Sequence, residues 1–178
     1  MLGGQMRIAT ITTGVIFVLD QLTKLAVVQG MNLIDRGVID VLPPFLTFRM
    51  AWNTGINFGL LSHDAAFMRW VLIAVALVIS TWVWIWIRRE NPGRWAQISA
   101  GLLVGGALGN VIDRIVYGAV ADFLNMSCCG VENPYAFNVA DISIFAGAIG
   151  LIFFTGGANK GDTAKAGKAR RGKGKPGA

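Results

Sequence analysis

Long apolar stretches dominate the chain, and shorter polar stretches separate them. Four apolar stretches approach or exceed the roughly 20 helical residues that cross the hydrocarbon core of a bilayer. They lie near residues 8–28, 65–87, 96–117 and 138–155, the last of them being short. This pattern predicts an all-α polytopic membrane protein with four transmembrane helices.

The segment between the first two predicted helices has a different texture. Pro43 and Pro44 break any helix there, and the apolar runs 38–42 and 45–50 are short. The second run alternates roughly between apolar and polar residues, which indicates small strands rather than a membrane span. We therefore expect a small β-region at about residues 30–61.

Charge changes the picture by giving the chain an orientation. The chain is 54% hydrophobic and 15% charged, with a net charge of +6, whereas a soluble domain carries roughly 25% charged residues. Lys and Arg concentrate in the tail and at 88–94, and the loop 118–136 has none. The positive-inside rule then predicts cytoplasmic termini, with 30–64 and 118–136 outside.

The last stretch of the chain differs from the rest in composition. From residue 156 onward it is rich in Gly, Ala and Lys and lacks the apolar content that a packed core needs. We expect a membrane domain at 1–157, with its β-region outside the cytoplasm, and a disordered basic cytoplasmic tail at 158–178.

Glycines recur at intervals of four in the third apolar stretch. Gly101, Gly105 and Gly109 would form one smooth helix face, and small residues at that spacing let helices approach closely in lipid. No strand precedes them, so a nucleotide-binding loop is not supported. We expect helix packing here, and no nucleic acid among the partners.

Cysteine and histidine chemistry has little support in the sequence. Cys128 and Cys129 are neighbours, which rarely bridge each other without strain, so no disulfide scaffold is implied. The single histidine, His63, has no second histidine to complete a zinc site. We expect neither a metal nor a cofactor.

Polar residues from four separate stretches are predicted to reach one depth, at the outer face. The third predicted helix runs outward and the fourth returns, so the end of one lies near the start of the other. Asp20 and Lys24 are four residues apart on one helix face and can pair. The residues at this depth are Asp20, Lys24, Asn53, Asn110, Asp113, Arg114, Asp122, Asn138 and Asp141.

Two carboxylates in this group, Asp122 and Asp141, suggest a reaction. Carboxylates that share a site cannot both ionise cheaply, so one pKa rises and an acid lies beside a base. Such a pair can activate a water and protonate a leaving amine, which is the chemistry of aspartic peptidases.

Five motifs together resemble those of the bacterial lipoprotein signal peptidase (signal peptidase II) family. Each motif is weak alone, but their order on four predicted spans is specific, and the resemblance covers roughly residues 15–152. The motifs are D-Q-L-T-K at 20–24, N-T-G-I-N-F at 53–58, G-G-A-L-G-N-V-I-D-R at 105–114, V-A-D-F at 120–123 and F-N-V-A-D at 137–141.

The resemblance implies an aspartic endopeptidase of the bacterial inner membrane, with four helices and a small extracytoplasmic β-cradle. Such an enzyme removes signal peptides from diacylglyceryl-modified prolipoproteins, cutting before the lipidated cysteine. It also implies membrane lipid as a partner, and we expect a monomer. By resemblance, the catalytic pair is Asp122 and Asp141; Asn53, Asn110, Arg114 and Asn138 line the site; and Asp20, Lys24 and Asp113 support it.

Two other functions remain open from the residues alone. Carboxylates within a membrane also suit a small transporter or a proton pathway, although that reading favours acids near the midplane and repeated halves. A non-catalytic assembly factor that binds lipidated proteins is the second alternative. Asp→Asn changes at Asp122 and Asp141 separate these possibilities, because an assembly factor should tolerate them and an enzyme should not.

Overall fold

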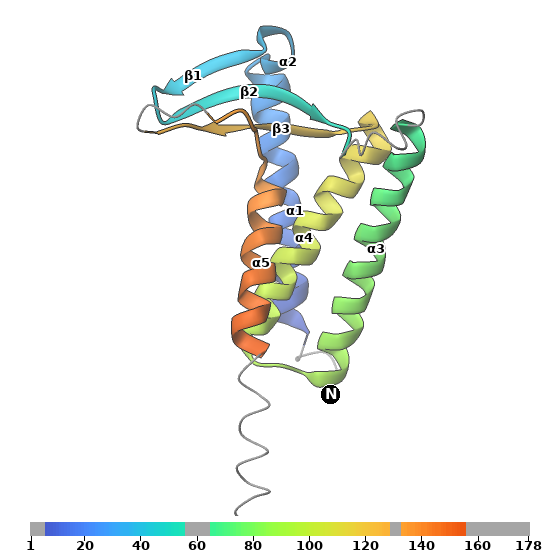
Figure 1. The fold of residues 1–178 in the computed structure, drawn as a ribbon. Helices are drawn as coiled ribbons and strands as arrows, with labels where there is room; N and C mark the ends of the chain where they lie inside the picture. The colour runs from blue at the N-terminus through green and yellow to red at the C-terminus, as the bar shows by residue number, and fades with distance from the viewer. Residues whose placement is uncertain (1–5, 56–64, 129–132, 156–178) are drawn as a thin grey trace, which may run out of the picture.

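The fold is a bundle of helices with a small sheet at one end, as seen in a computed structural model (Figure 1). The structure describes residues 6–55, 65–128 and 133–155. In chain order its elements are α1 (Arg7–Lys24), the π-helix η1 (Leu25–Gly30), α2 (Leu33–Arg36), β1 (Val38–Leu42), β2 (Leu46–Asn53), α3 (Ala65–Glu90), α4 (Arg94–Tyr117), β3 (Val120–Met126) and α5 (Val139–Thr155).

The predicted apolar stretches all form helices, with ends within a few residues of those expected. Among the described residues, α1 with η1, α3 and α4 are long and apolar enough to cross a membrane. α5 is apolar throughout but has only 17 residues. The first helix differs from expectation in its last turn, where Leu25–Gly30 has π-helical hydrogen bonding.

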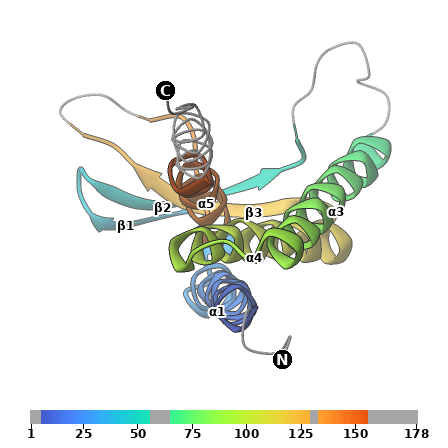
Figure 2. The same ribbon diagram turned by 90° about the horizontal axis from the view of Figure 1, so that it is seen from below.

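α4 is the central helix of the bundle. Seen from below, α1 lies on one side of α4, while α3 and α5 lie on the other (Figure 2). This position explains why α4 is the most buried of the three long helices.

Glycines set the close approach of α4 to its neighbours, as their spacing predicts. A Cβ atom on Gly101 would lie 2.6 Å from Thr12 Cβ, and one on Gly105 would lie 2.7 Å from the Thr13 carbonyl oxygen, both on α1. These distances are shorter than any real Cβ contact allows. The two helices can therefore keep this spacing only while both positions lack a side chain.

The small sheet has three antiparallel strands in the order β1-β2-β3. β1 and β2 fall in the predicted β-region, but β3 comes from Val120–Met126, which the sequence pattern assigns to a loop. The expectation of a β-region confined to 30–61 is therefore incomplete. Most of β3 is buried, so it lacks the alternation of apolar and polar residues that marks a half-exposed strand.

The sheet packs on the upper end of the bundle through its own apolar core. Leu33 and Phe123 are buried there, and the Phe123 ring meets the edge of Phe48 at 5.8 Å between centroids. This packing fixes β3 against η1 and α2, and β3 carries Asp122.

Candidate functional site

The start of α5 is built by a reciprocal cap between Asn138 and Asp141. The backbone N–H of Asp141 donates to Asn138 Oδ1 at 2.8 Å, and the backbone N–H of Asn138 donates to Asp141 Oδ2 at 3.3 Å. This is the pattern of a capping box, which satisfies N–H groups that a helix start leaves free. The same hydrogen bonds that begin the helix at N-V-A-D therefore also hold the Asp141 side chain in place.

Asp122 reaches the same place from β3. Gly118 ends α4 in the left-handed conformation, with φ of 83°, and turns the chain into the strand. Asp122 pairs with Ala51 of β2, next to a bulge that lies between Phe48 and Ala51. Bulges change the direction of side chains near functional sites, and this bulge adjoins the strand pair formed by Ala51 and Asp122.

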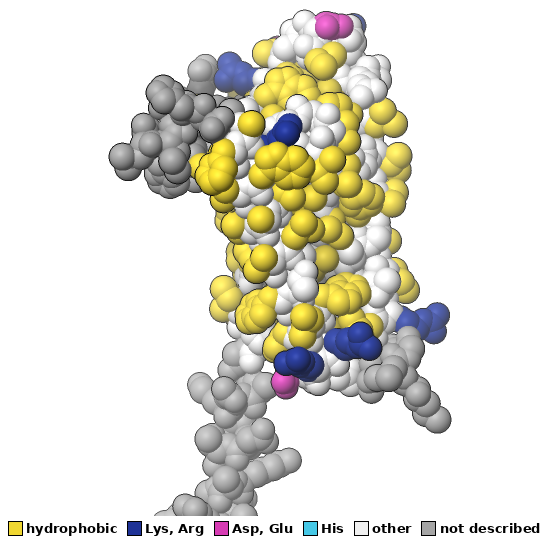
Figure 3. Space-filling view, turned by 90° about the vertical axis from the view of Figure 1, so that its right-hand side faces the viewer, with side chains coloured by type: hydrophobic (Ala, Val, Ile, Leu, Met, Phe, Trp, Pro, Cys, Tyr) yellow, Lys and Arg dark blue, Asp and Glu magenta, His cyan; other side chains and the backbone are white. Residues whose placement is uncertain are grey.

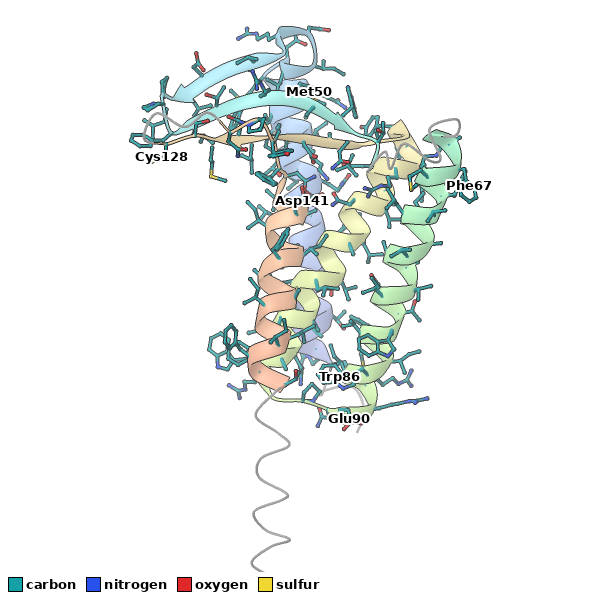
Figure 4. The ribbon with its side chains drawn as sticks, in the orientation of Figure 1. Met50, Phe67, Trp86, Glu90, Cys128 and Asp141 are labelled. Carbon is teal, nitrogen blue, oxygen red and sulfur yellow. The ribbon has the colours of Figure 1, made fainter. Side chains whose placement is uncertain are left out.

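Asn138 joins the two carboxylates. Its side-chain Nδ2 donates to Asp122 Oδ1 at 2.6 Å, while its own Oδ1 and backbone N–H bind Asp141. Asn138 is fully buried, so its amide is held by these partners rather than by solvent. Asp122 and Asp141, the two predicted catalytic residues, lie on different elements and are both hydrogen-bonded to Asn138. Asp141 is labelled beneath the sheet in Figure 4.

Two further amides complete the immediate surroundings of the carboxylates. Asn53 Nδ2, at the end of β2, donates to Asp122 Oδ2 at 3.0 Å. Asn110 Nδ2, on α4, donates to Asp141 Oδ1 at 2.9 Å. Each carboxylate therefore accepts a hydrogen bond from Asn138 and from one other amide.

A buried ion cluster lies behind this pair and centres on Lys24. Its Nζ is 2.8 Å from Asp20 Oδ2 and 2.7 Å from Asp113 Oδ2, and it also donates to Asn110 Oδ1 at 3.3 Å. Both acids are fully buried. The predicted pair of Asp20 and Lys24 is confirmed, and Asp113 joins it as a second acid on the same amine.

The two acids of the cluster each hold the backbone directly before a candidate catalytic residue. Asp20 Oδ1 accepts the N–H of Ala140 at 2.9 Å, and Asp113 Oδ2 accepts the N–H of Ala121 at 3.3 Å. Ala140 precedes Asp141, and Ala121 precedes Asp122. One lysine thus ties together the supports of both carboxylates.

Gln21 also belongs to this network, although no sequence pattern predicts it. Its Nε2 lies 3.2 Å from Asp20 Oδ2 and 3.1 Å from Asp113 Oδ1, and 3.4 Å from the Gly109 carbonyl oxygen. The available signal is an amide next to an acid in an apolar helix. Such an amide can donate to both acids that share the lysine.

Arg114 lies beside the site but is not paired with it. It is half-buried, and its Nη1 donates to the Asn110 carbonyl at 3.3 Å. Asp122 and Asp141 act on it electrostatically, yet neither comes within the 4.0 Å of an ion pair. Its guanidinium therefore keeps donors that the described residues do not use.

The electrostatics of the site separate Asp122 from an ordinary carboxyl. Burial, followed by the negative charge of Asp141, raises the pKa of Asp122 to about 6. The hydrogen bonds from Asn53 and Asn138 oppose this shift because they stabilise the ionised form. Asp122 can therefore hold a proton at pH values where a solvated aspartate has lost it.

The described acidic side chains around the site do not form a metal-binding group. In residues 6–55, 65–128 and 133–155, no group of three or more His, Cys, Asp or Glu side chains could hold a metal ion. His63 and Cys129 lie outside the described residues. Cys128 is disulfide-bonded, although the adjacency of the two cysteines in the sequence does not imply a disulfide scaffold.

Comparison with known sequences connects this site to a family. The model of the signal peptidase (SPase) II family matches residues 12–155. A lipoprotein signal peptidase of Methylobacterium radiotolerans is 43% identical over 135 residues, which cover 76% of this chain and 77% of the relative. A lipoprotein signal peptidase of Rhodopseudomonas palustris is 39% identical over 150 residues, 83% of this chain and 90% of the relative.

Solved structures agree with the sequence comparison. A bacterial membrane enzyme aligns with a TM-score of 0.65 and 25% identity, covering 96% of this chain and 94% of that enzyme. A second bacterial membrane enzyme structure aligns with a TM-score of 0.67 and 27% identity, covering 82% of this chain and 90% of that chain. The similarity therefore includes the sheet as well as the helices.

Proposed function

Because the chain belongs to the signal peptidase II family, we propose that it uses Asp122 and Asp141 as an aspartic pair to remove signal peptides from prolipoproteins. Signal peptide removal itself follows from the relatives, which are lipoprotein signal peptidases over most of this chain. The aspartic mechanism rests on one observation: both carboxylates accept a hydrogen bond from Asn138, Asp122 from its side-chain amide and Asp141 from its backbone N–H.

The proposed reaction needs one ionised and one protonated carboxyl. The ionised carboxylate takes a proton from a water, whose oxygen attacks the scissile carbonyl carbon. The protonated carboxyl gives its proton to the departing amine as the C–N bond breaks. The raised pKa of Asp122 supports this division, because it lets one member of the pair hold a proton up to a pH of about 6.

Arg114 and Asn53 are proposed to bind the substrate backbone. Arg114 lies beside the pair with unused guanidinium donors, and a planar fork suits a carbonyl or carboxylate partner. Asn53 holds Asp122 from the sheet side and lies at the end of β2. In this proposal, Asn110 and Asn138 orient the carboxylates, while Asp20, Lys24 and Asp113 support the backbone before them.

We propose that α5 crosses the bacterial inner membrane together with the three long apolar helices, with both termini in the cytoplasm. α5 measures about 26 Å along its axis, slightly less than the roughly 30 Å hydrocarbon core. Asp141, in its first turn, would then lie close to the outer interface. A diacylglyceryl-modified cysteine could keep its acyl chains in the lipid while the bond before it reaches the pair.

Conservative replacement of the pair tests the proposal. Asp122→Asn and Asp141→Asn keep the shape and remove the ionisable group, so each should lose nearly all single-turnover cleavage of a diacylglyceryl-modified precursor. The double variant should be little worse, because residues that act as one unit are not additive. Binding of the precursor, measured separately, should persist.

Asp113→Asn is the matched control for this experiment. It changes a buried carboxylate that contacts Lys24 and Ala121 but not the reacting atoms. We expect it to lower stability or binding more than the chemical step. Cleavage by Asp122→Asn at a rate near wild type would refute the catalytic role of Asp122 and with it the aspartic pair. A wild-type protein that binds the precursor without cleaving it would favour the assembly-factor alternative.

A further inference from the structure

A pocket of about 470 Å³ opens at the end of the bundle opposite the sheet. Its volume falls in the range of roughly 300–1,000 Å³ that is typical of ligand sites. Residues of α3 and α5 line it, together with Pro92 and Gly93 of the connection into α4. The residues used here are Trp82, Trp86 and Glu90 of α3 and Leu151, Phe154 and Thr155 of α5.

The lining of this pocket suits a cation. Three aromatic residues, Trp82, Trp86 and Phe154, line it together with the exposed acid Glu90. Figure 4 labels Trp86 and Glu90 at this end of α3. Aromatic faces attract Lys and Arg side chains, and a carboxylate adds direct charge complementarity. The basic residues of the same connection, at 88, 89 and 94, do not line the pocket.

The pocket lies on the same side of the bundle as the aspartate pair. α3 and α5 flank one side of α4, and α1 covers the other (Figure 2). At the sheet end, a Cβ on Gly55 would meet Leu72 and Met68 of α3, so the segment after Asn53 borders that helix. The aspartate pair and the pocket thus lie at opposite ends of the side bounded by α3 and α5.

The separation of the two ends matches the dimensions of a signal peptide. α5 has 17 residues and runs for about 26 Å between them. A signal peptide has a basic start and an apolar region of about 7–15 residues. Ten to twelve apolar residues in a helix span about 15–18 Å, and three extended residues before the cut add about 10 Å. Together these two lengths are close to the length of α5.

We propose that this pocket binds the positively charged start of the signal peptide while its far end lies at Asp122 and Asp141. The inference rests on the proposed function and adds a specificity element to it. A lysine or arginine at the substrate's start enters between Trp82 and Phe154 and pairs with Glu90. The pocket thereby sets how many residues separate the basic start from the cut.

Two precursors that differ only at this start provide the test. One carries two lysines and the other two glutamines, and both are diacylglyceryl-modified and presented to the full-length protein in zwitterionic liposomes. We expect wild type to favour the lysine precursor roughly two- to fivefold in kcat/KM. Glu90→Gln and Trp82→Leu should lose this preference yet cleave the glutamine precursor at the wild-type rate.

Asp35→Asn, an exposed acid on α2 at the sheet end, is the control and should keep the preference. A preference that survives Glu90→Gln, or is absent from wild type, would overturn the inference and leave the proposed function standing. Failure of wild type to cleave either precursor would instead refute the proposed function.

Two other occupants of the pocket are distinguished in the same assay. Changing Lys160, Lys165 and Lys168 of the tail to Gln should leave the Glu90 effect intact; its disappearance would show that the chain's own tail fills the pocket. If the difference in cleavage between wild type and Glu90→Gln depends on added phosphatidylethanolamine and not on the charge of the precursor, the pocket is a lipid site. Either result would refute the inference.

Discussion

At the scale of single residues, helical spacing predicts some contacts and leaves others open. The four-residue interval between Asp20 and Lys24 predicts their ion pair, which the structure confirms. The three-residue interval between Asn138 and Asp141 is that of a capping box. The bond from Asn138 to Asp122 could not be derived in this way, because it depends on where β3 lies.

The raised pKa of Asp122 leads to a prediction about pH. Asp122 loses its proton as pH rises through about 6, and the proposed pair needs one proton to release the amine. We therefore expect kcat/KM for a lipid-modified precursor to fall as pH rises through this value. A profile that stays flat between pH 5 and 8 would contradict the assignment.

Asn53→Leu should move this fall in activity to higher pH. Asn53 donates a hydrogen bond that stabilises the ionised form of Asp122. Removing the donor raises the pKa of Asp122, so the proton is held to a higher pH. The position of the pH limb is the measurement, since the height of the profile also reflects substrate binding. An unmoved limb would assign the titration to another group.

Lys24→Met tests the ion cluster behind the site. The change leaves Asp20 and Asp113 buried beside each other without their shared cation. Removing one partner of a buried ion cluster costs roughly 3–5 kcal/mol, so the Tm in detergent should fall clearly. Arg88→Met, at an exposed position on α3, is the control and should change the Tm little; equal Tm values would argue against the cluster's role.

At the scale of elements, the length of the apolar stretches predicts the helices better than the alternation of apolar and polar residues predicts the strands. The four apolar helices and the first two strands lie where the sequence predicts them. β3 does not, because a short buried strand carries no alternation and resembles an apolar loop. That strand holds Asp122, so the element that completes the site is the one that the pattern conceals.

Gly105→Leu tests the contact between α1 and α4. A side chain at Gly105 would meet the Thr13 carbonyl oxygen, which belongs to the backbone and cannot rotate away. We expect the free energy of unfolding to fall by roughly 1–3 kcal/mol, which lowers the Tm in detergent. Gly14→Leu is the matched control, because a Cβ at Gly14 meets no atom within 4 Å. Similar Tm values for the two variants would show that the contact is dispensable.

Gly109 has a different role from the other glycines of its stripe. A Cβ at Gly109 would collide with the Asp20 carboxylate rather than with a neighbouring backbone. Substitution there would therefore disturb the ion cluster as well as the packing. The regular spacing of the glycines predicts a common packing face but does not reveal that its last member touches the site.

At the scale of the whole molecule, polarity is divided between two ends. On the face seen in Figure 3, hydrophobic side chains cover the middle, and a row of basic side chains lies at the end opposite the sheet, with further basic side chains toward the sheet end. The amides and carboxylates of the candidate site lie at the sheet end. Charge counts along the sequence predict this division, since the basic residues cluster in a few connections.

Cysteine labelling tests the proposed orientation in the membrane. In a background with Cys128 and Cys129 changed to Ser, Asp35→Cys on α2 and Arg89→Cys on α3 mark opposite ends of the molecule. In cells whose outer membrane is made permeable, an impermeant maleimide should label the first variant. The second should react only after the inner membrane is opened. The reverse pattern would overturn the proposed topology.

The bond between Asp20 and the N–H of Ala140 joins residues 120 positions apart, and this separation has a consequence for biosynthesis. A ribosome delivers α1 first and α5 last, so the first helix waits with an acid whose partner has not yet been made. Asp141 and the support for its backbone arrive together with the final helix. If Asp141 acts as proposed, a chain that stalls before residue 139 is an inert membrane fragment, and proteolytic activity appears only when synthesis of the bundle is complete.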